Sequence, residues 1–208
     1  AQEQGYYTDI RTSLQSIRSQ HTTIDNTLAY NFSSGGFSSA SIVFSTTTLN
    51  NNSAGTSDVF LAKYDFDGNP LWANRAGDAD ADAGNSVAID TIGNAFITGY
   101  FISNSISFGG NTLTKSGPGY RDLFVTAYTP GGNVNWAITS AGGTFDEVGN
   151  GITVSNTGTT IYVGGMFNSS MVSFGASTLF KGCGDDVFVA KLFGTVAGVK
   201  EEYIKEEL

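Results

Sequence analysis

The stretch Asp58-Val-Phe-Leu-Ala-Lys-Tyr64 decides the fold, because the chain repeats it. It returns as Asp122-Leu-Phe-Val-Thr-Ala-Tyr128 and then as Asp186-Val-Phe-Val-Ala-Lys-Leu192, each time after 64 residues. Downstream, Gly68-Asn-Pro-Leu-Trp-Ala73 matches Gly132-Asn-Val-Asn-Trp-Ala137. Repeats of this length are typical of units that stack and bury their apolar faces against their neighbours.

A second segment recurs at a similar spacing. Ile42–Leu49 is matched by residues 106–113 and again by residues 172–179. The sequence therefore holds two full copies of the unit and a third copy that is cut off near Phe193.

Each unit alternates apolar and polar residues in short runs between Gly, Asn and Asp, the pattern of half-buried antiparallel strands. Two hairpins are predicted, Val59–Ala73 through a turn at 65–69 and Ser86–Tyr100 through a turn at 90–94. A Gly-Asn pair in each turn supplies the positive φ that it requires. We therefore predict an all-β fold of propeller-type, four-stranded antiparallel blades, two complete and one partial. Two blades and a partial third are too few to close a propeller ring. Other copies of the chain would therefore have to supply the missing blades.

The 208-residue chain is acidic and weakly charged. Charged residues make up 14% of it, against about 25% in an average soluble protein. Ten Lys and Arg face 19 Asp and Glu, so the basic surface that nucleic acid requires is missing. The chain has one histidine and one cysteine, which nearly excludes His-dependent triads, His-rich metal sites and disulfide frameworks within one chain. No cofactor is expected.

The sequence has no apolar run long enough to predict a membrane span. Its Thr, Asn and Gly content favours an extracellular or cell-surface location.

A heptad pattern precedes the repeats and predicts an N-terminal α-helix over residues 7–28. Its apolar positions lie three and four residues apart with isoleucine at d, which favours coiled-coil trimers or tetramers. We predict that residues 1–31 form an oligomerisation segment; the alternative is one amphipathic helix lying on its own β domain. The seam consists of Tyr7, Ile10, Leu14, Ile17, His21, Ile24 and Leu28.

Four spaced motifs occur in order within the repeats: Asp-x-Phe-Val-Ala-Lys, Gly-Asn-x-x-Trp-Ala, Gly-Asn-x-Ile-x-Val, and a Gly-Asn turn before Phe/Tyr-Ile/Val-Thr/Gly-Gly. Over about 160 residues, from Ile42 to Phe193, the chain resembles the bacterial seven-bladed or SBBP-type β-propeller repeat. This resemblance implies propeller-type blades in a secreted or cell-surface protein, commonly of Bacteroidota, without shared catalytic residues. The tail from Val199 to Leu208 is similar to the linker that precedes the sorting domain of type nine secretion cargo.

Three carboxylates at alternate positions form the one candidate metal site. Asp78, Asp80 and Asp82 alternate as ligands do in calcium loops, because a hard cation needs several converging oxygens. The following glycine comes late and no glutamate follows at the expected distance. The alternative, a solvated acidic loop, is therefore favoured over calcium.

Aromatic residues at equivalent repeat positions are expected to form the core between blades, because each buries a large apolar area. Stacking of sugar rings on them is the alternative, and Tyr100, Tyr120 and Tyr162 are further candidates for an exposed platform. The predicted core residues are Phe60, Trp72, Phe124, Trp136 and Phe188.

Other acidic residues are expected to serve structure. Asp58, Asp122 and Asp186 start equivalent strands and should cap or close turns. Asp146 and Glu147, a candidate acid pair for glycoside hydrolysis, are adjacent and would face opposite sides of a strand.

These observations divide the chain into an N-terminal helix (1–31), a β-repeat domain (32–195) and an acidic C-terminal tail or linker (196–208). We predict a non-enzymatic extracellular structural or adhesive protein that assembles through its helix and shared blades as a homo-oligomer or filament. The alternatives are a lectin-like propeller that binds a glycan and a secreted glycan-active enzyme.

Overall fold

The computed structural model describes residues 30–53, 55–117, 120–142, 144–182, 184–195 and 198–203. Every regular element in these ranges is a β-strand, so the all-β part of the prediction is correct. The prediction of an added N-terminal α-helix is wrong for this fold, because the described chain contains no helix and follows strand periodicity from Tyr30 onward. The heptad positions from Tyr7 to Leu28 lie outside the described residues. That segment is also rich in Ser and Thr, which are weak helix formers.

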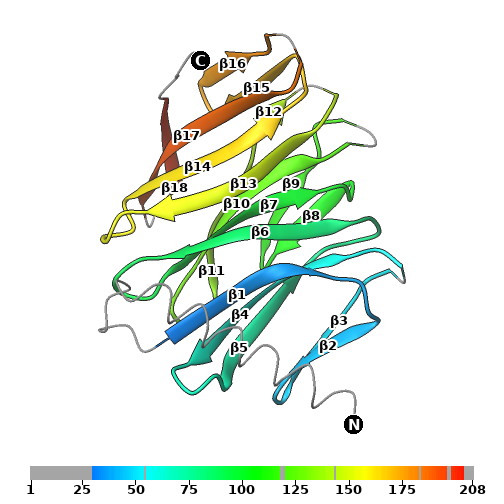
Figure 1. Cartoon of the computed structure of the whole chain (residues 1–208), viewed down its shortest axis with the longest axis vertical. Coiled ribbons are helices and arrows are strands. Elements are labelled where there is room, and N and C mark those ends of the chain that lie inside the picture. The colour runs from blue at the N-terminus through cyan, green and yellow to red at the C-terminus, as the bar shows by residue number, and fades with distance from the viewer. Residues whose placement is uncertain are drawn as a thin grey trace.

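Three units of strands lie one above another along the long axis of the molecule (Figure 1). The first unit has a three-stranded sheet of order β1-β4-β5 and a separate hairpin β2-β3. Its strands are β1 (Tyr30–Phe37), β2 (Ser41–Phe44), β3 (Thr47–Asn50), β4 (Asp58–Asp65) and β5 (Pro70–Ala76).

The second unit has a four-stranded sheet of order β11-β10-β7-β6 and a hairpin β8-β9. Its strands are β6 (Asp82–Ile89), β7 (Ala95–Phe101), β8 (Ser105–Phe108), β9 (Asn111–Thr114), β10 (Asp122–Tyr128) and β11 (Val134–Thr139).

The third unit repeats this plan with sheets of order β13-β14-β17-β18 and β12-β15-β16. Residues 198–203, which the sequence placed in a tail or linker, form a strand paired with β17. The strands are β12 (Ala141–Gly142), β13 (Glu147–Val154), β14 (Thr160–Phe167), β15 (Met171–Phe174), β16 (Ser177–Phe180), β17 (Asp186–Thr195) and β18 (Gly198–Tyr203).

Both predicted hairpins are present, as β4-β5 and β6-β7. Their turns form as predicted, because Asp65 accepts hydrogen bonds from the backbone of residues 67 and 69 and Asp90 accepts them from residues 92 and 94. Gly68 and Gly93 have φ values of 84° and 88°. Sequence analysis missed the small hairpins β2-β3, β8-β9 and β15-β16, which the repeat of Ile42–Leu49 encodes.

The two sides of each sheet have different partners. The side that includes Phe60, Phe124 or Phe188 packs on the hairpin of the same unit, and we call it the hairpin face. The opposite side, which we call the forward face, packs on the following unit. The forward-face residues are Val59 and Leu61 in the first unit, Leu123 and Val125 in the second, and Val187 and Val189 in the third.

Two of the three apolar clusters lie between units, and the third lies within the first unit. Val59 and Leu61 of the first unit share one cluster with Ile106 and Phe124 of the second. The forward face of the second unit and the hairpin face of the third form the next cluster in the same way. Each of the two clusters between units combines a sheet, a hairpin and the preceding sheet, so the second and third units each share a core with the unit before them.

A glycine opposite each repeated phenylalanine allows this packing. Gly165 pairs with Phe188 across β14 and β17. A Cβ atom on Gly165 would lie 2.5 Å from the Phe188 ring and 2.1 Å from the Val148 carbonyl oxygen. The Phe188 ring can lie over the strand only because the glycine has no side chain.

Candidate functional site

The forward face of the third unit is the largest departure from the repeat. Val187 is 71% exposed and Val189 is 50% exposed. The equivalent residues Val59 and Leu123 are 1% and 0% exposed, because the following unit covers them. The repeat thus places an apolar strand surface where the described residues supply no cover.

The opposite end of the stack is also incompletely covered. Ile42 and Phe60, on the hairpin side of the first unit, are half-buried. Their equivalents in the second unit, Ile106 and Phe124, are buried beneath the forward face of the first unit. The first unit therefore has its own hairpin and sheet, but the described residues include no preceding forward face to cover them.

Polar contacts fasten the first unit to the second. The ammonium of Lys63 and the indole N–H of Trp72 each donate to the Pro130 carbonyl at 3.0 Å, and the Asn74 amide donates to the Gly132 carbonyl at 2.7 Å. Burial lowers the pKa of Lys63. These contacts hold the turn of one unit against the sheet of the preceding unit.

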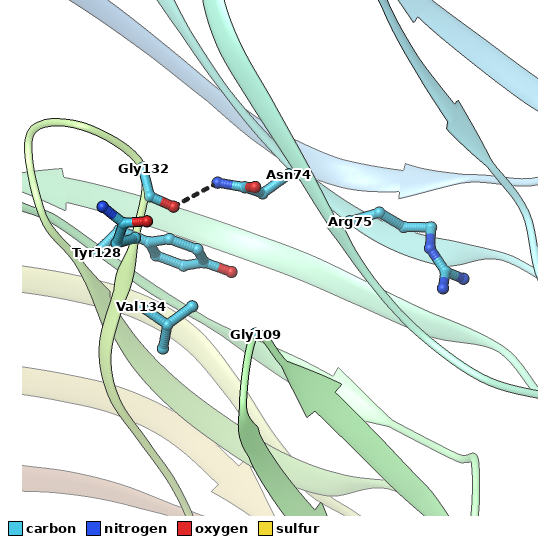
Figure 2. Close-up of a pocket in the computed structure, with 7 residues that line it drawn as sticks. Asn74, Arg75, Gly109, Tyr128, Gly132 and Val134 are labelled. Carbon is cyan, nitrogen blue, oxygen red and sulfur yellow. Dashed lines mark hydrogen bonds between the residues drawn. The ribbon is translucent and has the colours of Figure 1, made fainter.

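A pocket of about 240 Å³ lies beside this junction. Figure 2 shows the Asn74 amide directed at the Gly132 carbonyl, while the Arg75 guanidinium points away from Tyr128. Arg75 forms an ion pair with the buried Asp58, and burial raises the pKa of Tyr128. The polar groups of Asn74 and Arg75 thus bind neighbouring segments of the protein, and we assign the pocket to the seam between units.

An exposed aromatic patch lies where the second unit meets the third. The rings of Tyr120 and Phe145 have centroids 5.0 Å apart, and both side chains are exposed. The Arg121 guanidinium lies 4.8 Å from the centroid of the Tyr100 ring and forms a 3.9 Å ion pair with Asp146. The patch combines ring faces with a charged donor and an acceptor.

The three acids weighed as a calcium candidate differ in exposure, and the backbone N–H of Asp78 donates to the Asp82 carboxylate. Asp78 and Asp80 are exposed, whereas Asp82 is buried. Asp82 accepts hydrogen bonds from the backbone of Ile102 and from the backbone and hydroxyl of Ser103. Among the residues that the structure describes, no three His, Cys, Asp or Glu side chains are grouped to hold a metal ion.

Glu147 takes the place of Asp82 in the third unit but lacks those partners. It is fully buried, and neither carboxylate oxygen has a partner at hydrogen-bonding geometry. Its pKa is raised to about 8, mainly by burial; the Ser169 hydroxyl opposes this increase, and the charges of Asp122 and Asp146 add to it. Asp146, which precedes β13, accepts a hydrogen bond from the Arg121 backbone, so the two adjacent acids have different surroundings.

The strand-starting aspartates close loops, as predicted. Asp58 accepts from the backbone of Asn52, and Asp122 accepts from the backbone and hydroxyl of Ser116. Asp186 accepts from the backbone N–H of Gly182.

The predicted core aromatics lie at the contacts between units and hairpins. Phe124 and Phe188 are buried, whereas Phe60, Trp72 and Trp136 are half-buried. Trp72 packs on the cluster between the first and second units, and Trp136 packs on the cluster between the second and third.

Comparison with known proteins gives one distant similarity. No family model matches the chain. An uncharacterized WD repeat-containing protein of Acanthamoeba polyphaga mimivirus is 28% identical over 131 residues, which cover 61% of this chain and 9% of that protein. The similarity and the strand-rich fold together support a β-propeller-like repeat protein. They do not support the resemblance to the bacterial SBBP-type repeat. They also do not support the interpretation of the tail as a linker before a type nine secretion sorting domain.

The described residues contain no helix that is long and apolar enough to cross a membrane.

Proposed function

We propose that this chain is a non-enzymatic scaffold of β-propeller-like repeats that serves as a structural or adhesive module outside the cell. In this proposal the chain presents surfaces to other macromolecules and joins further repeat units to make an oligomer or filament. One observation carries the proposal: equivalent faces form every internal junction, and the last of these faces is left uncovered. A large exposed apolar surface on a folded unit is characteristic of an interaction site.

The weakly charged composition supports the extracellular location. The similarity to a long WD repeat-containing protein supports the scaffold role, because repeat architectures provide extended binding surfaces.

Adhesion and turnover measured together test this function. The purified chain is applied to immobilised cell-wall polysaccharides and to whole cells, and the retained protein and the released reducing sugar are both quantified. We expect retention on a surface without sugar release. Steady release of reducing ends, lost when Asp146 is replaced by Asn, would contradict the non-enzymatic role. Failure to adhere to any surface would contradict the adhesive role.

The aromatic patch favours glycan binding as a second candidate function. Tyr120 and Phe145 are exposed and adjacent, so they offer apolar faces for a sugar ring, while Arg121 and Asp146 offer hydrogen-bonding groups. We expect Tyr120→Ala to abolish retention on a glycan array. Ile92→Ala is the matched control, because Ile92 is an exposed apolar residue in the turn between β6 and β7. Equal retention of both variants would contradict glycan binding at this patch.

A further inference from the structure

We propose that the forward face of the third unit binds the hairpin side of the first unit in a second copy of this chain. The inference rests on the proposed scaffold function and adds the surfaces and the direction of assembly. The contact is head to tail: Val187 and Val189 of one copy cover Ile42 and Phe60 of the next.

The two internal junctions are the template for this contact. In the first, Val59 and Leu61 lie in one cluster with Ile106 and Phe124. In the second, Leu123 and Val125 lie in one cluster with Val172 and Phe188, so the same positions meet again.

The two ends of the stack carry the matching halves of a third junction. Val187 and Val189 occupy the positions of Val59 and Leu61. The two valines are exposed to solvent, whereas Val59 and Leu61 are buried. Ile42 and Phe60 occupy the positions of Ile106 and Phe124, and they are only half-buried, although their equivalents are buried in both internal junctions. Both ends are therefore incomplete at the positions that the repeat uses for contact.

A polar contact stabilises the first junction and does not recur in the second. Lys63 stands on the forward side of the first unit and donates to the Pro130 carbonyl in the turn of the following unit. The third unit has Lys191 at this position, whereas the second has Ala127. The turn residue equivalent to Pro130 in the first unit is Phe66, which is exposed.

A second copy is the occupant that these residues specify. The missing cover must have a hairpin side with an aliphatic residue and a phenylalanine at fixed repeat positions, and the first unit of this chain has both. The contact joins different surfaces of the two copies, so it is heterologous and gives a ring where the rotation closes or a filament where it does not.

Sedimentation velocity of the full chain across a concentration series tests the proposal. We expect reversible association, and we expect Val187→Glu with Val189→Glu to weaken it by about 100-fold or more, because two charges would be buried without partners. Both valines are exposed in the single chain, so the double variant should keep its far-UV circular dichroism and melting temperature. Ile92→Glu is the control, since it adds a charge at an exposed apolar site outside the contact and should leave association unchanged.

A charge pair tests the direction of the contact. Val189→Glu and Ile42→Lys should each weaken association alone, and a mixture of the two variants should recover it. A discrete mass in the wild type indicates a ring and a ladder of masses indicates a filament; both support the head-to-tail contact.

Two results would overturn the proposal. One is a wild-type chain that stays monomeric up to about millimolar concentration, in the range of the weakest specific contacts. The other is an oligomer that Val189→Glu disrupts and Ile42→Lys leaves intact, since that oligomer would be a symmetric contact between two third units. Neither result affects retention on surfaces, so this inference can fail while the proposed adhesive function stands.

Discussion

The buried carboxyl of Glu147 predicts that the protein loses stability as the pH rises through neutrality. Burial and the charges of Asp122 and Asp146, opposed by the Ser169 hydroxyl, together raise its pKa to about 8. In the unfolded chain the same group has an ordinary pKa of 4.5. The folded protein therefore holds this proton more tightly than the unfolded chain does.

The sign and the size of the effect follow from these two values. The contribution of Glu147 to stability is complete below pH 4.5, falls as the pH rises, and is lost above about pH 8. The full loss is about 5 kcal/mol, of which about 4 kcal/mol falls between pH 5 and pH 9. This is a large share of the roughly 5 to 15 kcal/mol that stabilises a typical domain.

Urea unfolding at each pH unit from 5 to 9 measures the effect, with Glu147→Gln as the perturbation. Glutamine keeps the shape and removes the charge, so the variant reports how all other groups respond to pH. We expect the wild type to lose about 4 kcal/mol more than Glu147→Gln across this range. Asp80→Asn is the matched control, because it removes an exposed carboxylate from the loop before Asp82.

Parallel stability curves for the wild type and Glu147→Gln would refute this reasoning. They would mean that the Glu147 carboxyl ionises in the folded state at the same pH as in the unfolded chain. A curve of Asp80→Asn that departs from the wild type as far as Glu147→Gln does would refute it as well, since the effect would then not come from burial.

Three further predictions concern the packing between strands and units. Gly165→Ala should lower the free energy of unfolding by about 1 to 3 kcal/mol in urea titrations, because its Cβ would lie 2.1 Å from the Val148 carbonyl oxygen, whereas Gly151→Ala, with no atom within 4 Å of its added Cβ, should be tolerated. Arg75→Met should cost about 3 kcal/mol in the same assay, because it leaves the fully buried Asp58 without its cation; a loss no larger than that of a surface substitution would contradict the role of this ion pair. Trp72→Phe keeps an aromatic ring but loses the N–H that donates to the Pro130 carbonyl, so we expect a loss of about 1 kcal/mol, and an unchanged melting temperature would count against this fastening.

Local features of the fold could be predicted because short-range chemistry determines them. The hairpins β4-β5 and β6-β7 follow from alternating apolar residues on either side of Asp-x-x-Gly-Asn turns, in which Asp65 and Asp90 bind their own turn. The capping role of Asp122 likewise depends on residues only a few positions away. The helix over residues 7–28 was predicted from spacing alone, in a segment of weak helix formers, and the described fold contains no helix.

The burial of a residue by a neighbouring unit could not be predicted from the residue type at that position of the repeat. Leu123 and Val187 are similar residues at the same position of the repeat, but the third unit covers Leu123, whereas no described unit covers Val187. Glu147 and Asp82 are both acids at the start of equivalent strands. Asp82 meets three donors from Ile102 and Ser103, while Glu147 meets none at hydrogen-bonding geometry.

The sequence by itself determined the repeat and the hairpins β4-β5 and β6-β7, since the turns of these hairpins depend on neighbouring residues. Only the tertiary structure decided which sheet face is covered, which acid is isolated and where the stack lacks a neighbour. These properties depend on contacts between residues far apart in the chain, because two of the three apolar clusters combine residues of adjacent units.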